Sequence, residues 1–198
     1  MKRIGVLALQ GDFAEHVAML QHLGAEARLV RLRGDLDDLS GLIIPGGEST
    51  TISRLMREYD LLQPISELCQ RGLPVMGTCA GMVLLASNVI DPADAEVTPL
   101  NAMDIDVKRN AFGRQVDSFE TDIVVPAIGE RAFHGVFIRA PFIQRAGDGV
   151  AVLARLPDGT CVAARQGNIL ALSFHPELTD DSRLHSYFLS LLNGDVKP

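Results

Sequence analysis

Apolar residues follow two alternating spacings along the first half of the chain. Short apolar runs are typical of buried strands, and apolar side chains at every third or fourth position are typical of helices. We expect strands at residues 3–9, 27–30, 41–44 and 74–77, and helices at residues 13–23, 50–58 and 62–69. Strands that alternate with helices are joined by right-handed crossovers, so this half predicts a parallel sheet covered on both faces.

The later part of the chain has a different pattern, with short strands joined by turns. We expect strands at residues 105–107, 117–125, 136–138, 150–155, 161–165 and 169–174, followed by a helix at residues 183–192. These strands predict an antiparallel extension of the same sheet. The predicted fold is therefore α/β: one domain over residues 1–198, with a three-layer open sheet that is mostly parallel and helices on both faces.

Composition narrows the possible partners and surroundings. The 198 residues are 47% hydrophobic, and the formal net charge is −7. An acidic chain does not attract nucleic acid or an anionic membrane, and no apolar run is long enough to span a bilayer. The three cysteines are odd in number and widely spaced, so neither a disulfide framework nor a zinc site is expected. The chain begins with an expected strand rather than a signal peptide, and we predict a reducing, cytoplasmic location.

The most informative motif is residues 77–81, Gly-Thr-Cys-Ala-Gly, between an apolar run and an expected helix. Glycines on either side allow the sharp turn of a nucleophile elbow, which lifts one side chain above the sheet. The positive end of the helix dipole favours a thiolate there. Cysteine is often simply buried in a core, but this setting makes Cys79 a candidate catalytic nucleophile. By contrast, we expect Cys69, in a helix, and Cys161, in a strand, to be packing residues.

A histidine and an acid follow the last expected strand. Residues two apart in an extended segment point to the same side, so His175 and Glu177 are expected to be neighbours. Alone, the pair would be interpreted as a strand-end histidine and a surface acid. Together with Cys79, it completes the set that activates a thiol for acyl transfer. We assign His16, His22, His134 and His185 to structural or exposed positions.

The loop Gly46-Gly47-Glu48-Ser49 follows the third expected strand. It lies at the carboxyl end of a parallel strand, where open α/β sheets bind ligands. Its glycines let backbone N–H groups approach an oxyanion or a small polar substrate. A glycine pair after a strand is also an ordinary turn, so its expected proximity to the elbow carries the prediction.

Together these motifs resemble the class I, triad-type glutamine amidotransferases, whose fold is flavodoxin-like. The finer match is to the glutaminase-subunit family of pyridoxal 5′-phosphate synthases, over nearly the whole chain. The matching stretches are residues 6–11, 45–51, 77–81, 109–120, 136–141 and 173–179. Gly-Glu-Ser-Thr-Thr and Arg-Asn-x-Phe-Gly-Arg-Gln are specific to this subunit. Two departures are Ala111, where serine is expected, and residues 91–99, which match nothing in the family.

The resemblance implies hydrolysis of L-glutamine to glutamate and ammonia through a γ-glutamyl thioester. Cys79 would attack, His175 would transfer the proton, and Glu177 would orient His175. The implied oxyanion hole is formed by the N–H groups of Gly47 and Ala80. The implied substrate-binding residues are Gly47, Glu48, Ser49, Arg109, Ile138 and Arg139.

The family also implies a partner and no cofactor. Ammonia would pass to a synthase subunit that makes pyridoxal 5′-phosphate, within a large hetero-oligomeric complex. No metal, organic cofactor, nucleic acid or membrane is expected. The sequence leaves the roles of Gln10, Arg114 and Gln115 open: Gln10 is a candidate for the oxyanion region or the partner interface, and the other two for fold, pocket or partner.

Three alternatives remain at this point. The chain could serve another amidotransferase, such as imidazole glycerol phosphate synthase, although the subunit-specific stretches argue against this. It could be a cysteine peptidase or hydrolase, which the strand-end His-Pro-Glu disfavours. It could also be a non-catalytic regulatory module of the same fold, which the intact Cys79, His175 and Glu177 disfavour.

Overall fold

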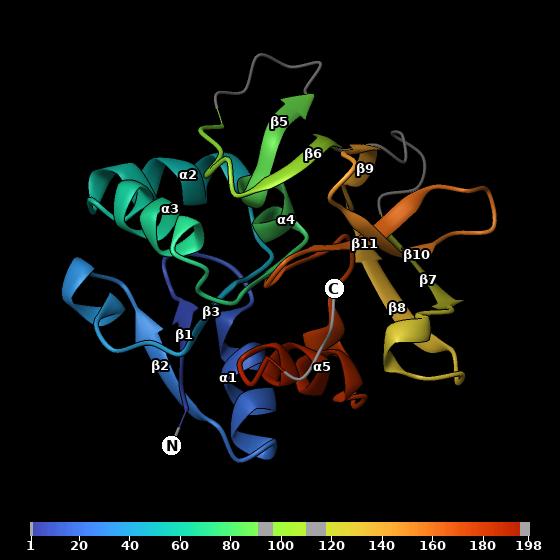
Figure 1. Ribbon diagram of the computed structural model, residues 1–198, viewed down its shortest axis with the longest axis horizontal. Helices are drawn as coiled ribbons and strands as arrows, with labels where there is room; N and C mark the ends of the chain where they lie inside the picture. The colour runs from blue at the N-terminus through green and yellow to red at the C-terminus, as the bar shows by residue number, and fades with distance from the viewer. Residues whose placement is uncertain (1, 91–96, 110–117, 195–198) are drawn as a thin grey trace.

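The computed structural model describes residues 2–90, 97–109 and 118–194 (Figure 1). The strands are β1 (Arg3–Leu7), β2 (Glu26–Val30), β3 (Gly41–Ile44), β4 (Val75–Thr78), β5 (Ala86–Ile90), β6 (Met103–Lys108), β7 (Ser118–Ile123), β8 (Phe133–Ile138), β9 (Phe142–Ala146), β10 (Ala151–Arg155), β11 (Cys161–Gln166) and β12 (Ile169–Leu172). The α-helices are α1 (Phe13–His22), α2 (Ser49–Glu58), α3 (Leu62–Gln70), α4 (Ala80–Leu85) and α5 (Arg183–Leu191). Short 3₁₀ turns are η1 (Arg33–Leu36), η2 (Pro126–Ile128) and η3 (Pro176–Leu178).

One large mixed sheet organises the molecule. Its strands run in the order β2-β1-β3-β4-β12-β11-β9-β6-β5, with β10 paired to β11, while β7 and β8 form a separate hairpin. The pairs from β2 through β12 are all parallel, and β11 pairs antiparallel with β12, β9 and β10. The first five positions have the doubly wound, flavodoxin-like order, with β12 as the fifth strand. The predicted parallel sheet with an antiparallel extension is confirmed.

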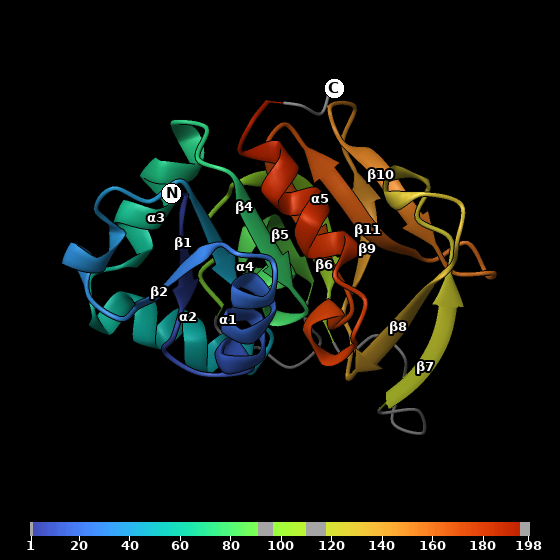
Figure 2. The ribbon, with the colours of Figure 1, turned by 90° about the horizontal axis from the view of Figure 1, so that it is seen from below.

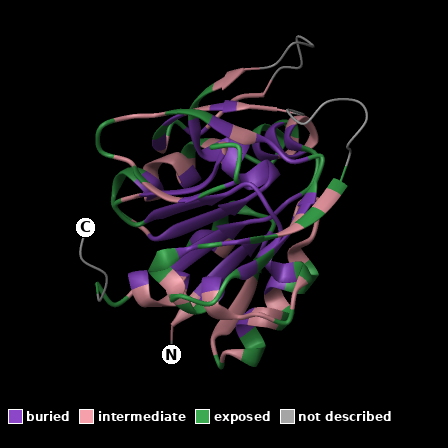
Figure 3. Cartoon of the chain, turned by 90° about the vertical axis from the view of Figure 1, so that its right-hand side faces the viewer, coloured by how far each residue is buried: buried purple, intermediate pink, exposed green. Residues whose placement is uncertain are grey.

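Two apolar clusters fill the two faces of the sheet. Alternation along β3 sends Ile43 into one cluster and Ile44 into the other. Helices α2, α3 and α4 pack on the Ile44 side, whereas α1 and α5 pack on the Ile43 side. Figure 1 shows the first group above the sheet and the second below it, and Figure 2 shows α1 and α5 in front of the strands. The buried residues gather on the strands between these layers (Figure 3).

The structure adds two strands that the sequence analysis did not identify. The apolar run after the elbow is divided between a helix and a strand, because α4 ends at Leu85 and the chain continues directly as β5. Strand β9 was missed because Gln144 and Arg145 interrupt its apolar pattern; both are exposed, while Ile143 is buried. No helix in residues 2–90, 97–109 or 118–194 has the length and hydropathy that a membrane crossing needs.

Candidate active site

Four neighbouring parallel strands bring most of the predicted site residues together, and Arg109, Ile138 and Arg139 join them from the ends of β6 and β8. Because β1, β3, β4 and β12 run in the same direction, the segments that follow them meet at one edge of the sheet. The pocket at this edge has a volume of about 660 Å³. Every residue predicted for the site lines it except the buried Glu177: Gly47, Glu48, Ser49, Cys79, Ala80, Arg109, Ile138, Arg139 and His175.

Cys79 occupies a strained backbone conformation between β4 and α4. Its φ is 47° and its ψ is −103°, a region that costs a non-glycine residue roughly 1–3 kcal/mol. Its N–H donates to the carbonyl of Leu172 at 2.8 Å, which ties the elbow to the end of β12. The flanking glycines are required by close packing, since a Cβ on Gly77 would lie 2.6 Å from the backbone of Gly81, and one on Gly81 would lie 2.0 Å from the Ile44 oxygen. The nucleophile-elbow geometry is therefore present as predicted.

His175 and Glu177 are neighbours, but their local geometry differs from the prediction. Nδ1 of His175 lies 2.7 Å from Oε1 of Glu177. The sequence predicts that both lie on one side of an extended segment, whereas Glu177 lies in the 3₁₀ turn η3. The His175 N–H donates to the carbonyl of Val136 in β8 at 2.9 Å. The turn brings the carboxylate back under the imidazole, because Pro176 begins a tight 3₁₀ turn there.

The electrostatics of this pair favour a charged imidazolium. Burial opposes the charged form, but hydrogen bonds and charges from Cys79 and Glu177 outweigh it and raise the pKa of His175 to about 10. Burial also raises the pKa of Glu177, and its hydrogen bond with His175 opposes that effect. The hydrogen bond to Glu177 occupies Nδ1 of His175 and leaves Nε2 for Cys79.

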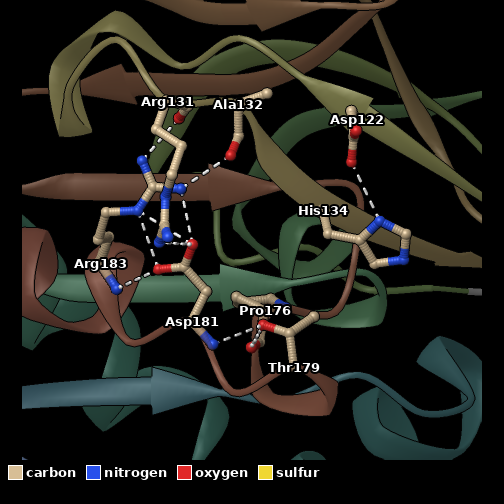
Figure 4. A network of polar contacts seen from close by, with 8 residues as sticks. All are labelled: Asp122, Arg131, Ala132, His134, Pro176, Thr179, Asp181 and Arg183. Atoms are coloured by element: carbon tan, nitrogen blue, oxygen red, sulfur yellow. Dashed lines mark hydrogen bonds and ion pairs between the residues drawn. The ribbon is translucent and has the colours of Figure 1, made fainter.

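The segment after Glu177 is fixed by a polar network (Figure 4). Asp181 binds the Arg183 guanidinium through both carboxylate oxygens, with Nε at 3.0 Å from each. Arg183 also donates to the carbonyls of Arg131 at 2.7 Å and Ala132 at 2.9 Å, just before β8. Thr179 closes the turn by donating to the Pro176 carbonyl at 3.1 Å. These contacts hold the Glu177 turn against β8, the strand that accepts from the His175 N–H.

The glycine loop lies directly against the imidazole of His175. A Cβ on Gly46 would lie 2.3 Å from Cε1 of His175, so only glycine fits there without a shift. The Gly46 carbonyl accepts from the N–H of Asp12 at 3.1 Å, and Oε1 of Gln10 accepts from the N–H of Glu48 at 2.7 Å. Gln10, whose role the sequence left open, thus anchors this loop to the end of β1.

Glu48 has a structural contact set in addition to its position on the pocket. It is the N-cap of α2, accepting from the N–H groups of Thr50 at 3.2 Å and Thr51 at 2.7 Å. Partial burial opposes ionisation, but hydrogen bonds from the side chains of Thr50 and Thr51, together with these backbone bonds, prevail and lower the pKa of Glu48 to about 2. Nη2 of Arg109 lies 3.4 Å from Oε1 of Glu48, so the pocket wall carries a fixed pair of opposite charges.

The far wall of the pocket comes from the end of β8. The Ile138 carbonyl lies 3.7 Å from Sγ of Cys79, within reach of a thiol hydrogen bond. The next residue, Arg139, is exposed and has a positive φ of 43°. Ala111, Arg114 and Gln115 lie outside the described residues.

Sequence reasoning missed Asp12, which also lines the pocket. Its Oδ2 lies 3.4 Å from Nδ1 of His175. The only signal was its place in a turn at the end of β1. Among residues 2–90, 97–109 and 118–194, Asp12, His175 and Glu177 are the one group of three whose possible metal-ligand atoms all lie within 4.8 Å of one another. Within this group, Nδ1 of His175 and Oε1 of Glu177 are hydrogen-bonded to each other.

The remaining histidines and cysteines divide by burial. His22 and His134 are exposed, whereas His16 and His185 are fully buried. Cys69 and Cys161 are buried free thiols, as the sequence predicted for packing residues. Burial raises the pKa of Cys69 to about 11 and also raises that of Cys161, so neither is a reactive thiolate near neutral pH.

Comparison with known proteins shows the family of the chain. The model of the SNO glutamine amidotransferase family matches residues 6–193. A protein of Parafrankia sp. (strain EAN1pec) named pyridoxal 5′-phosphate synthase subunit PdxT is 55% identical over 194 residues, covering 98% of this chain and 95% of that protein. The protein of the same name from Dehalococcoides mccartyi (strain CBDB1) is 55% identical over 190 residues, covering 96% of both chains. A crystal structure of a glutamine amidotransferase superimposes with a TM-score of 0.89 at 51% identity, covering 96% of this chain and 98% of that one.

Proposed function

This chain belongs to the SNO glutamine amidotransferase family and is the glutaminase subunit of a pyridoxal 5′-phosphate synthase, and we propose that Cys79, His175 and Glu177 are its catalytic triad. One observation carries the proposal. A strained cysteine elbow and a buried His–Glu pair, separated by nearly a hundred residues of sequence, meet at one pocket at the carboxyl edge of the sheet. We further propose that residues 1–198 form a single glutaminase domain.

The triad performs acyl transfer in two steps. In the first, Sγ of Cys79 bonds to the side-chain amide carbon of glutamine while Nε2 of His175 holds the thiol proton. His175 then gives that proton to the amide nitrogen, and the C–N bond breaks. Ammonia departs, and a γ-glutamyl thioester remains on Cys79. In the second, His175 takes a proton from water, whose oxygen attacks the thioester carbon. The C–S bond breaks, glutamate leaves, and the proton returns to Cys79.

The oxyanion of each tetrahedral intermediate would be bound by backbone N–H groups of Gly47 and Ala80. Ala80 is the first residue of α4, where the N–H has no partner within the helix. Gly47 belongs to the loop that Gln10 and Asp12 hold against the pocket. Two such donors at fixed positions stabilise the developing charge without reorganisation.

The charges on the pocket wall suit the α-ammonium and α-carboxylate of glutamine. In our proposal, the carboxylate of Glu48 binds the ammonium and the guanidinium of Arg109 binds the carboxylate. Ser49, Ile138 and Arg139 complete the substrate-binding wall. Fixing both ends of the amino acid orients the side-chain amide toward Cys79.

The chemistry of the product, ammonia, explains why the chain needs a synthase subunit as its partner. At neutral pH free ammonia takes up a proton and loses its nucleophilicity, so its use in synthesis needs a shielded path. We propose that the chain works docked to the synthase subunit in a large hetero-oligomeric complex, and that it requires no metal or organic cofactor of its own.

Ammonia release from L-glutamine tests the triad assignment. The assay is run with and without the cognate synthase subunit, on the wild-type chain, on Cys79→Ala and on the matched buried-thiol control Cys69→Ala. We expect Cys79→Ala to be inactive and Cys69→Ala to retain turnover. Substantial release by a folded Cys79→Ala chain would refute the nucleophile.

A further inference from the structure

Two buried histidines lie directly behind the triad. His16 comes from α1 and His185 from α5, and both have 0% relative exposure. Nδ1 of His16 lies 2.9 Å from Nε2 of His185. Two polar rings in contact inside a core are costly to bury unless their hydrogen bonds are used.

The other face of His16 reaches the triad acid. Its Nε2 lies 3.4 Å from Oε2 of Glu177 and 3.2 Å from Oγ1 of Thr78, the last residue of β4. The other carboxylate oxygen of Glu177, Oε1, is hydrogen-bonded to Nδ1 of His175. Among the described residues, Oε2 of Glu177 has no well-formed hydrogen bond. The polar atom that faces it is Nε2 of His16.

Burial favours the neutral form of both histidines. Burial, reinforced by the charges of His185 and His175, holds the pKa of His16 well below its usual range. Burial lowers the pKa of His185 to about 4. Each ring therefore carries one proton, and the position of that proton decides what His16 presents to Glu177.

Only one arrangement of the two protons is favourable. If Nδ1 of His16 donated to His185, the lone pair of His16 Nε2 would face the Glu177 carboxylate and repel it. That arrangement would also leave an N–H on Nδ1 of His185, an atom with no hydrogen-bond partner in the described residues. In the reverse arrangement, His185 donates to Nδ1 of His16, and the N–H of His16 faces Glu177 and Thr78. The unpaired atom is then a bare lone pair on His185, which costs less to bury than an unpaired donor.

We propose that His16 is a positioning residue for the triad: its Nε2–H faces Oε2 of Glu177, and His185 holds it in that tautomer. The inference rests on the triad assignment above. The chain of contacts runs from His185 through His16 and Glu177 to His175 and Cys79. Through it, α1 and α5 set the orientation and ionisation of the carboxylate that aligns the catalytic imidazole. Neither histidine touches substrate.

The tautomers test the proposal without any substitution. In ¹⁵N NMR spectra of the wild-type chain, the nitrogen shifts of a neutral histidine identify which ring nitrogen carries the proton. We expect both His16 and His185 to carry it on Nε2 at neutral pH. A His16 protonated on Nδ1, or on both nitrogens, would overturn the proposal.

Kinetics test the function of the contact. In the complex with the synthase subunit, His16→Leu should lower kcat by roughly ten- to a hundredfold, the effect of losing one hydrogen-bond donor to a charged group. His16→Gln should recover much of the loss, because its amide can donate to Glu177 and accept from His185. His22→Leu, on the exposed side of the same helix, is the matched control and should behave as wild type.

A double-mutant cycle separates positioning from packing. If His16 acts through Glu177, His16→Leu should have little further effect on kcat in a Glu177→Ala chain. Undiminished loss in that background, or wild-type kcat in a folded His16→Leu chain, would overturn the proposal while leaving the triad intact. A Glu177→Ala chain with full activity would instead refute the triad itself. Thermal unfolding of each variant identifies those that fail to fold.

Discussion

Replacing Gly46 with alanine places a methyl group where the His175 ring lies. The new Cβ would be 2.3 Å from Cε1 and 2.9 Å from Nδ1 of His175. The ring must move by about 1 Å to reach an ordinary contact distance. The ring cannot move freely, because its Nδ1 is hydrogen-bonded to Oε1 of Glu177 at 2.7 Å and the His175 backbone N–H donates to the Val136 carbonyl.

In the proposed triad, a shift of that size displaces the His175 imidazole, the proton carrier, from Cys79, the nucleophile. Misplacing a catalytic group by about 1 Å costs roughly a hundredfold in rate. We therefore expect Gly46→Ala to lower kcat for ammonia release by about that factor, with an overpacking cost of about 1–3 kcal/mol in stability. KM for glutamine should change less, since Glu48 and Arg109 remain in place.

The matched control is Gly34→Ala, because a Cβ there meets no atom within 4 Å. Steady-state ammonia release gives kcat and KM for both variants, and thermal unfolding gives the stability change. A folded Gly46→Ala chain with wild-type kcat would refute the reasoning, because it would mean that the imidazole tolerates displacement or is not the proton carrier.

Three further predictions concern charge and the Glu177 turn. With the pKa of His175 raised to about 10, its proton is present at neutral pH and lost as pH rises through that value, so kcat/KM for ammonia release should fall above about pH 10; a fall centred near 6.5 would contradict this. Arg183→Met should destabilise the chain by about 1–3 kcal/mol in denaturant unfolding, because it removes the two-oxygen pairing with the part-buried Asp181 and the donor to the Arg131 and Ala132 carbonyls, whereas the control Arg131→Met removes an exposed pair worth under about 1 kcal/mol. Equal effects of the two would disprove the anchoring role of Arg183. Glu48→Gln removes the charge and leaves one oxygen where two accept at the helix cap, so KM for glutamine should rise by about tenfold and the melting temperature should fall; an unchanged KM in the folded variant would exclude the contact with the α-ammonium.

Much of the fold follows from local patterns in the sequence. The apolar runs that became β3 and β4 are fully buried and bounded by turn residues, so their periodicity identifies them as central parallel strands. Strands β5 and β9 were missed for a different reason. Two adjacent polar residues break the apolar pattern in each, Ser87 and Asn88 in β5 and Gln144 and Arg145 in β9, and β5 follows α4 without any turn residue to mark the boundary.

In the candidate site, too, some residues can be identified from local sequence, whereas other contacts arise only when the chain folds. Cys79 could be identified because its flanking glycines are a local requirement of the elbow. His175 and Glu177 were paired correctly, although the 3₁₀ turn that joins them depends on Pro176 and on the anchoring of the following segment. The contact between His16 and His185 spans 169 positions and arises only when α1 and α5 pack on the same face of the sheet. No periodicity distinguishes such a pair from ordinary core histidines.

The most direct test of the account is the site at which a glutamine-analogue electrophile becomes attached. The chain, docked to its synthase subunit, is incubated with 6-diazo-5-oxo-L-norleucine, digested, and analysed by mass spectrometry alongside the ammonia-release assay. We predict one adduct, on Cys79, with none on the buried Cys69 and Cys161, and loss of ammonia release in proportion to labelling. Inactivation with the adduct on another residue, or ammonia release that continues after Cys79 is fully labelled, would contradict the assignment of Cys79 as the nucleophile.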